Sequence, residues 1–309
     1  MAVVIGRIAE VYHYLNDEIS DPRALDYPLM KNPLKVLLLL IFYLYFVLKW
    51  GPKYMEKRKP FNLERILIVF NVAQIAVCSY MFISAMSVLI PMKHNWLCQP
   101  MDYSRTPYPM HLVKMSYIYF LTKILDLLDT VFFILRKKDN QVTFLHVYHH
   151  GGMLLLTWIG VKYLPGGHGV TVGILNSFVH VAMYTYYLLS SFDSKYKNNI
   201  WWKKHITQLQ LIQFFILTLH FLVLFFIDCG FPQFTAYFML PQNIFMLAMF
   251  GDFYIKAYIK PSTPADQPHT GSKSHKLLNG SIDSYLDAMN VSHGNAESNG
   301  IAKDYGKSE

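Results

Sequence analysis

Three histidines stand close together in the stretch FLHVYHHGG, which covers residues 144–152 and leads into an apolar run. On a helix, the spacing of His146, His149 and His150 places all three side chains on one face. Such a cluster can ligate a metal ion, supply a nucleophile or form a buried hydrogen-bond network. The residues around the cluster have to distinguish these possibilities.

A metal site is considered first, because membrane desaturases and hydroxylases that bind two iron ions use the spacing HxxHH. Two irons need ligands from several such motifs, here called histidine boxes, and the sequence has no second HxxHH or HxxxH. Beyond the box, only His180 and His220 lie in segments that carry other polar residues. A zinc ion held by some of these histidines stays open, although Cys or Glu ligands at suitable spacing are missing. We expect no metal and keep a metal-dependent lipid desaturase or hydroxylase as an alternative.

The second possibility is a nucleophile that accepts an acyl group and stays unprotonated. A water-poor environment keeps an imidazole neutral, and a neighbouring imidazole can fix its tautomer. His149, flanked by His146 and His150, fits these needs. Cys78 does not compete for this role, because we expect its apolar segment to offer no polar partner.

Further polar residues lie inside apolar segments and must face a bundle interior or a cavity, because their exposure to lipid is costly. Each also has a structural interpretation, as a buried ion pair, an aromatic packing stripe or an amide bond between helices. Polar groups occur at similar depth in several of these segments. This pattern predicts a polar chamber in the cytosolic half of the membrane. The residues are Lys123, Asp126 and Asp129 in TKILDLLDT, Asn176, His180, Tyr184 and Tyr187 in NSFVHVAMYTYY, and Gln210 and Gln213 in TQLQLIQF.

The elements that position these residues are predicted to be membrane-spanning helices. Of the 309 residues, 53% are hydrophobic and only 16% are charged, which is typical of integral membrane proteins. Apolar runs near the length of a bilayer crossing predict an all-α integral membrane protein with seven transmembrane helices. The runs cover residues 34–50, 66–90, 112–135, 145–163, 170–191, 206–227 and 234–258.

Basic residues set the predicted orientation, because cytosolic loops are enriched in Lys and Arg. They are frequent after the first, third and fifth runs and sparse or absent after the second, fourth and sixth. We therefore predict a non-cytosolic N-terminus and a cytosolic C-terminus. Cys98 and Cys229 would then lie in loops facing an oxidising compartment, which predicts a disulfide between them.

The chain divides into three predicted parts. Residues 1–33 form a lumenal segment, whose start MAVVIGRIAEVYHYL lacks the features of a secretory signal and is expected to be an amphipathic surface helix. Residues 34–260 form the transmembrane domain. Residues 261–309 form a polar, disordered cytosolic tail, where the glycosylation patterns at Asn279 and Asn290 would stay unused. The basic loops are interpreted as cytosolic flanks, and no nucleic-acid partner is expected.

These motifs together give a family resemblance. The sequence resembles the very-long-chain fatty acid elongases, condensing enzymes of the endoplasmic reticulum that make 3-oxoacyl-CoA from acyl-CoA and malonyl-CoA. The segments KILDLLDTVFFILRKK, HVYHH, NSFVHVAMYTYY and TQLQLIQF occur in the order and spacing of that family, and the resemblance covers about residues 20–260. The family usually has Glu where Asp126 stands, and it often ends in a dilysine retrieval signal where this chain ends KDYGKSE.

The resemblance implies a fold in which helices two to seven ring a narrow tunnel, closed at the lumenal end and open to cytosolic CoA esters. It implies that His149 takes the acyl chain as an acyl-imidazole, while His146, His150 and His180 position it and move protons. The side chains implied to stabilise enolate and oxyanion charge are Asn176, Tyr184, Tyr187, Gln210 and Gln213. Those implied to hold the helices in register are Lys123, Asp126 and Asp129. Those implied to receive the phosphates of CoA are Arg136, Lys137, Lys138, Lys203, Lys204 and Lys256.

The resemblance also implies substrates, partners and location. Acyl-CoA and malonyl-CoA would be the substrates, no cofactor would be bound, and the protein would be a multi-pass protein of the endoplasmic-reticulum bilayer. Other enzymes of the elongation cycle, or a second copy of the chain, are candidate partners. A non-enzymatic seven-span transporter or receptor is the remaining alternative, although it would more naturally carry polar groups through both halves of the membrane.

Overall fold

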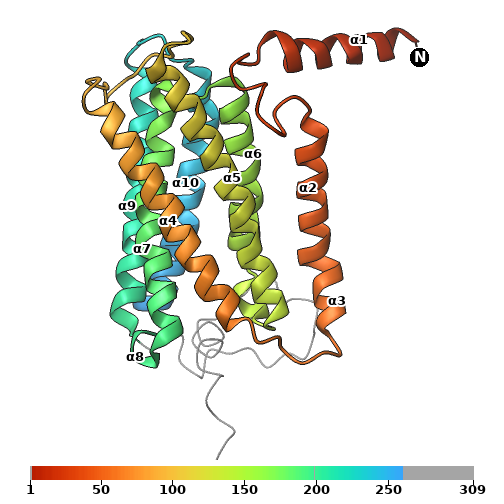
Figure 1. Ribbon diagram of the computed structural model, residues 1–309, viewed down its shortest axis with the longest axis vertical. Coiled ribbons are helices and arrows are strands. Elements are labelled where there is room, and N and C mark those ends of the chain that lie inside the picture. Colours follow the sequence, from red (N-terminus) through yellow and green to blue (C-terminus); the bar gives the residue numbers. More distant parts are fainter. Residues whose placement is uncertain (1, 198, 260–309) are drawn as a thin grey trace, which may run out of the picture.

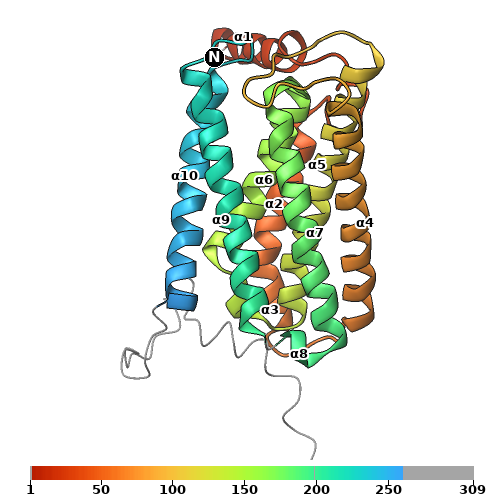
Figure 2. The same ribbon diagram turned by 90° about the vertical axis from the view of Figure 1, so that its left-hand side faces the viewer.

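The structure is a computed structural model that describes residues 2–197 and 199–259. Within these ranges every regular element is a helix, and the long helices run side by side as a bundle (Figure 1 and Figure 2). The predicted tail, residues 261–309 with Asn279 and Asn290, lies outside the described residues. The bundle contains α2 (Pro33–Tyr45), extended through η2 (Phe46–Trp50) and α3 (Gly51–Met55), α4 (Glu64–Leu89), α5 (Pro107–Leu135), α6 (Phe144–Tyr163), α7 (Val170–Phe192), α9 (Ile200–Leu222) and α10 (Phe234–Tyr254). The short elements are α1 (Ala2–His13), η1 (Tyr14–Glu18), η3 (Asp139–Gln141), η4 (Gly167–Gly169), α8 (Ser194–Lys197), η5 (Val223–Phe225) and η6 (Ile255–Ile259).

Several of these helices are long and apolar enough to cross a membrane. Within the described part of the chain there are 5 such segments, namely Pro33–Met55, Glu64–Leu89, Gly167–Phe192, Ile200–Phe225 and Phe234–Ile259. Between them in the bundle run α5 and α6, which carry the charged and histidine motifs (Figure 1). The prediction of an all-helical, multi-pass membrane protein is therefore confirmed.

Local sequence explains where several helices begin. Pro33 occupies the first turn of α2, and the preceding Asn32 accepts a hydrogen bond from the Leu34 N–H at 2.8 Å. Pro107 likewise opens α5, so this helix starts before the apolar run predicted from residue 112. Asn199 caps α9 through the Trp201 N–H at 2.9 Å, which places its start before residue 206.

The long helices enclose a central space. Helix α4 packs against α5 and α7, α7 against α9, α9 against α10, and α5 against α6. Side chains complete the ring between α6 and α10, where the Tyr148 hydroxyl donates to Gln242 Oε1 at 2.7 Å and the rings of Tyr148 and Phe245 lie 5.0 Å apart. Helix α2 lies outside this ring, against α6 (Figure 1).

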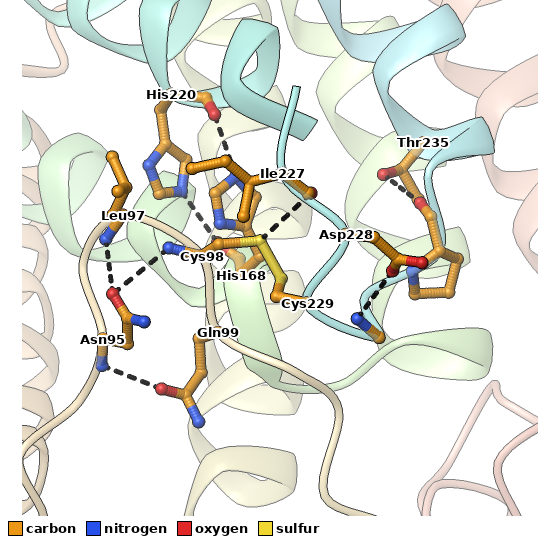
Figure 3. The surroundings of a disulfide bond; sticks show 12 residues. Asn95, Leu97, Cys98, Gln99, His168, His220, Ile227, Asp228, Cys229 and Thr235 are labelled. Atoms are coloured by element: carbon orange, nitrogen blue, oxygen red, sulfur yellow. Dashed lines mark hydrogen bonds between the residues drawn. A yellow bond between two sulfur atoms is a disulfide. The ribbon is translucent and has the colours of Figure 1, made fainter. Parts of the chain in front are cut away.

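One end of the bundle, here called the disulfide end, is held together by Cys98 and Cys229. The predicted pair forms a disulfide that joins the loop before α5 to the loop before α10 (Figure 3). Helix α1 lies across the same end (Figure 1). Beside the disulfide, the rings of His168 and His220 stack 3.6 Å apart, and each Nε2 donates to the backbone carbonyl of the other residue. This pair ties η4 to α9, so His220 has a structural role.

The segment between η1 and α2 is fixed to the disulfide end by buried polar contacts. Arg23 pairs with Asp21 at 2.6 Å and donates to two backbone carbonyls of the loop before α5, each at 2.8 Å. The fully buried Lys162 on α6 donates to Asn16 Oδ1 and to the Met30 carbonyl, both at 2.8 Å. The N-terminal segment is therefore an integral part of this end.

Candidate active site

The histidine box occupies the first two turns of α6. Thr143 caps the helix by accepting the His146 N–H at 3.2 Å, which fixes where these turns begin. The rings of His146 and His150 lie 4.2 Å apart, and those of His149 and His150 lie 5.6 Å apart. The structure therefore brings the three imidazoles into one cluster, as their spacing predicted.

Of the three, only His149 lines the central cavity. Its ring lies within 6.5 Å of the rings of Phe214 on α9 and Phe250 on α10, and Phe214 also lines the cavity. Its Nδ1 is buried and has no hydrogen-bond partner among the described residues, so Nε2 is the nitrogen available to a ligand.

Behind His149, the first histidine of the box is held by a chain of hydroxyl groups. The Tyr43 hydroxyl on α2 lies 2.8 Å from Thr130 Oγ1, and Thr130 Oγ1 lies 2.9 Å from His146 Nε2. If Thr130 donates to His146 and Tyr43 donates to Thr130, each hydroxyl hydrogen has an acceptor. This arrangement leaves Nε2 of His146 as an acceptor. Tyr43 and Thr130 are not predictable from the sequence, because nothing in their local pattern links them to the box.

The predicted charged residues of α5 form a buried network with α4 and α7. Lys123 Nζ donates to Asp126 Oδ2 at 2.8 Å and to Asn176 Oδ1 at 2.7 Å. The Tyr184 hydroxyl donates to Asp129 Oδ2 at 2.8 Å. His180 Nδ1 lies 3.8 Å from Asp126 Oδ2. The network thus joins α5 to α7 beside the histidines.

One expectation about α4 is wrong. The segment around Cys78 was expected to have no polar partner, yet Gln74 is 1% exposed and donates from Nε2 to Asp126 Oδ1 at 2.6 Å. The run contains two amides three residues apart, Asn71 and Gln74, and both are buried, so their position inside a predicted span was itself an indication of burial. Cys78 is buried and not disulfide-bonded.

The cavity has a volume of about 990 Å³ and is lined by every helix of the ring. Its lining residues on α6 and α9 closest to the end opposite the disulfide are His149 and Gln213. From there it continues between mainly apolar side chains to the loops of the disulfide end. The predicted polar chamber is therefore only one end of a longer and mostly apolar space. The cavity does not extend past His149 toward the opposite end, so the predicted opening there stays a prediction.

Some predicted site residues do not line this cavity. Tyr184 is occupied by the carboxylates of α5, and Tyr187 is 38% exposed. Gln210 is directed at Met183 Sδ, 3.8 Å from its Nε2, whereas Gln213 lines the cavity and is 6% exposed. The spacing in the sequence correctly predicts which side chains share one side of a helix. It does not predict which other helix or cavity that side contacts.

The predicted phosphate-binding residues lie at the end opposite the disulfide, here called the basic end. Lys137 donates to the Glu56 backbone carbonyl at 3.2 Å, and Lys256 pairs with Asp252 at 2.7 Å. None of them lines the cavity. The remaining members of this group are Arg136, Lys138, Lys203 and Lys204.

Fold and site together define an all-helical membrane protein with a histidine at the polar end of an apolar chamber. The model of the GNS1/SUR4 family, also called ELO, matches residues 28–266. The chain is 41% identical over 263 residues to human very long chain fatty acid elongase 1, covering 84% of this chain and 92% of that protein. It is 37% identical over 294 residues to very long chain fatty acid elongase 7 of Drosophila melanogaster, covering 95% and 88%. The chain therefore belongs to the GNS1/SUR4 family, which confirms the resemblance seen in the motifs.

Proposed function

We propose that this enzyme elongates fatty acids by condensing acyl-CoA with malonyl-CoA to give 3-oxoacyl-CoA, CO₂ and CoA. The observation that carries the proposal is the position of His149, at the polar end of a long apolar cavity. The volume, about 990 Å³, lies at the upper end of the range of roughly 300–1,000 Å³ found for small-molecule sites. An acyl chain fits the apolar part, with its reactive carbonyl beside the imidazole.

In the first half-reaction, the free nitrogen of His149 attacks the thioester carbon of acyl-CoA. A C–N bond forms, the carbonyl oxygen takes up negative charge, and the C–S bond then breaks. The CoA thiolate leaves with the proton lost by the imidazole, so the products are acyl-imidazole and CoA. His146 and His150 support the nucleophile through their ring contacts, and the Lys123–Asp126 pair, which lies beside His180, provides the fixed charges nearby.

In the second half-reaction, malonyl-CoA loses CO₂ and the electron pair of the broken C–C bond gives an enolate. The enolate carbon attacks the acyl-imidazole, a C–C bond forms and the C–N bond breaks. One proton from solvent restores the neutral imidazole, and 3-oxoacyl-CoA leaves. Asn176 and Gln213, which line the cavity, are proposed to stabilise negative charge on oxygen. Decarboxylation supplies the carbanion, so the scheme uses no bound cofactor.

The basic end is proposed to receive CoA. Arg and Lys side chains bind phosphates well, and six predicted basic residues, Arg136, Lys137, Lys138, Lys203, Lys204 and Lys256, lie at this end. With CoA in the cytosol, the disulfide end faces the lumen of the endoplasmic reticulum. This orientation goes with seven membrane crossings, a lumenal segment 1–33 and a cytosolic tail 261–309. The disulfide at the far end supports it, because disulfides persist in oxidising compartments.

The proposal is tested by incubating purified protein with acyl-CoA alone. We expect release of one equivalent of CoA and the added acyl mass on the peptide that contains His149. His149→Ala abolishes both signals, whereas His111→Ala, which changes a histidine on α5 that does not line the cavity, leaves them intact. CoA that appears only after malonyl-CoA is added would instead indicate direct condensation without an acyl-enzyme.

A further inference from the structure

Two amide side chains in the cavity wall have their oxygen atoms already occupied. Asn176 Oδ1 accepts from Lys123 Nζ at 2.7 Å, and an ammonium group can only donate. Gln242 Oε1 accepts from the Tyr148 hydroxyl at 2.7 Å. Both amides line the cavity together with His149. In each case the amide nitrogen is therefore the group left for a ligand.

The orientation of Gln242 follows from the hydrogen of Tyr148. If the amide were turned around, its nitrogen would donate to the phenol oxygen, and the hydroxyl hydrogen would lose its only acceptor among the described residues. The Gln242 Nε2 hydrogens have no acceptor among those residues either. A donor without a partner in a mainly apolar cavity indicates a ligand that carries an acceptor atom.

Gln242 is connected to the nucleophile through the residue that precedes it, because Tyr148 binds Gln242 directly. Tyr148 directly precedes His149 on α6, and its ring packs against Phe245 of α10. The ring of His149 packs against Phe250, further along the same helix. Helix α10 thus passes beside His149, with Gln242 fixed by the neighbouring side chain.

We propose that Gln242 is a substrate-contacting residue that stabilises the oxyanion formed when His149 attacks the acyl thioester, and that Tyr148 positions it. As the C–N bond forms, the π electrons of the carbonyl move to its oxygen, and this oxygen accepts hydrogen bonds from the amide nitrogens of Gln242 and Asn176. When the C–S bond breaks, the carbonyl re-forms and the charge leaves with the CoA thiolate. The inference rests on the proposed acyl transfer and adds a donor from α10 that the motifs do not contain.

The test measures a single turnover of full-length protein with acyl-CoA alone, following CoA release and acyl mass, together with the affinity for acyl-CoA. Gln242→Met keeps the size of the side chain and removes both amide hydrogens. We expect acylation to slow by about a hundredfold, as for loss of one oxyanion donor, with affinity unchanged within about twofold. Gln208→Met is the matched control, because Gln208 also bonds a tyrosine of α10, Tyr254 at 2.8 Å, but does not line the cavity. It should acylate at the wild-type rate.

A second variant, Tyr148→Phe, keeps Gln242 and releases its oxygen, so the amide no longer holds one orientation. We expect a smaller slowing, about three- to tenfold, again without loss of affinity. If Gln242→Met acylates as fast as Gln208→Met, the inference is wrong. If Gln242→Met does not fold, a wild-type acylation rate in Tyr148→Phe contradicts the inference instead. Wild-type protein that never gains the acyl mass contradicts the proposed acyl-enzyme, and the inference falls with it. Acylated wild type with unaffected variants contradicts this inference alone.

Discussion

At the scale of single residues, two Lys–Asp pairs within the described part of the chain stand in opposite surroundings. Lys123 and Asp126 are each 4% exposed and stand 2.8 Å apart on α5, whereas Lys256 and Asp252 are 65% and 57% exposed. Taking charges out of water is costly, so a buried pair depends on both of its members. An exposed pair contributes little, because water already solvates each charge.

We predict that Lys123→Met destabilises the protein by about 3–5 kcal/mol, since it leaves the Asp126 carboxylate buried without its cation. Lys256→Met, which breaks the exposed pair, should change stability by about 1 kcal/mol or less. Thermal unfolding of both variants in the same detergent checks the difference. Equal shifts of the unfolding midpoint would contradict a structural role for the buried pair.

A second residue-scale feature is the hydroxyl chain from Tyr43 through Thr130 to His146. Thr130→Val preserves shape but removes the donor to His146 Nε2, which should loosen the cluster behind His149. We expect kcat to fall about tenfold with KM unchanged within about twofold, and Thr130→Ser to retain most of the activity. Thr218→Val is the control, because the Thr218 hydroxyl bonds only a backbone carbonyl of its own helix. A raised KM with unchanged kcat would speak against this positioning role.

At the scale of elements, the disulfide connects loops that lie 131 residues apart in sequence. A cross-link over so long a loop restricts the unfolded chain, which is worth about 2–4 kcal/mol in many proteins. We predict that the double variant Cys98→Ser, Cys229→Ser unfolds at a lower temperature than the wild type. Reducing agent should lower the midpoint of the wild type alone and leave that of the variant unchanged. A midpoint that reductant does not alter in either protein would show that the cross-link adds no stability.

Also at this scale, α2 contacts the elements of the site in two ways. It lies outside the ring, yet it supplies Tyr43 to the histidine cluster and packs closely on α6, where a Cβ on Gly151 would come within 3.2 Å of Leu40. The glycine allows this close approach between the two helices. Helix α2 therefore supports the first turns of α6 through the Tyr43 hydroxyl and through close packing at Gly151.

At the scale of the whole molecule, the ring of helices encloses a cavity that runs from His149 to the disulfide end. Gly160 of α6 lines it, and a Cβ at this position would meet nothing within 4 Å. We predict that Gly160→Leu fills part of this space and shifts the products toward shorter acyl chains. Chromatography of the products from a series of acyl-CoAs measures the shift.

Gly251→Leu provides the control for this change, because position 251 on α10 is equally open but does not line the cavity. Both substitutions replace a helical glycine, so they should raise helix stability by similar amounts, about 0.5–1 kcal/mol. An unchanged product profile in Gly160→Leu would show that the acyl chain does not pass this position.

The sequence alone determined what depends on local spacing. Apolar runs of sufficient length predict helices that cross a bilayer, and the intervals of three and four residues place the histidines of the box together. The same reasoning paired Lys123 with Asp126, three residues apart on one helix. The disulfide could also be predicted from the sequence, because the charges of the loops predict which cysteines lie on the same side of the membrane.

Only the tertiary structure decided which helix faces meet. Gln74, Tyr43 and Gln242 stand on different helices from the groups they bond, and no interval along the chain encodes those distances. Conversely, Tyr187 and Gln210 fit the predicted stripes but do not line the cavity. A helical pattern fixes the direction of a side chain relative to its own axis, whereas the rotation and neighbours of each helix come from packing the whole bundle.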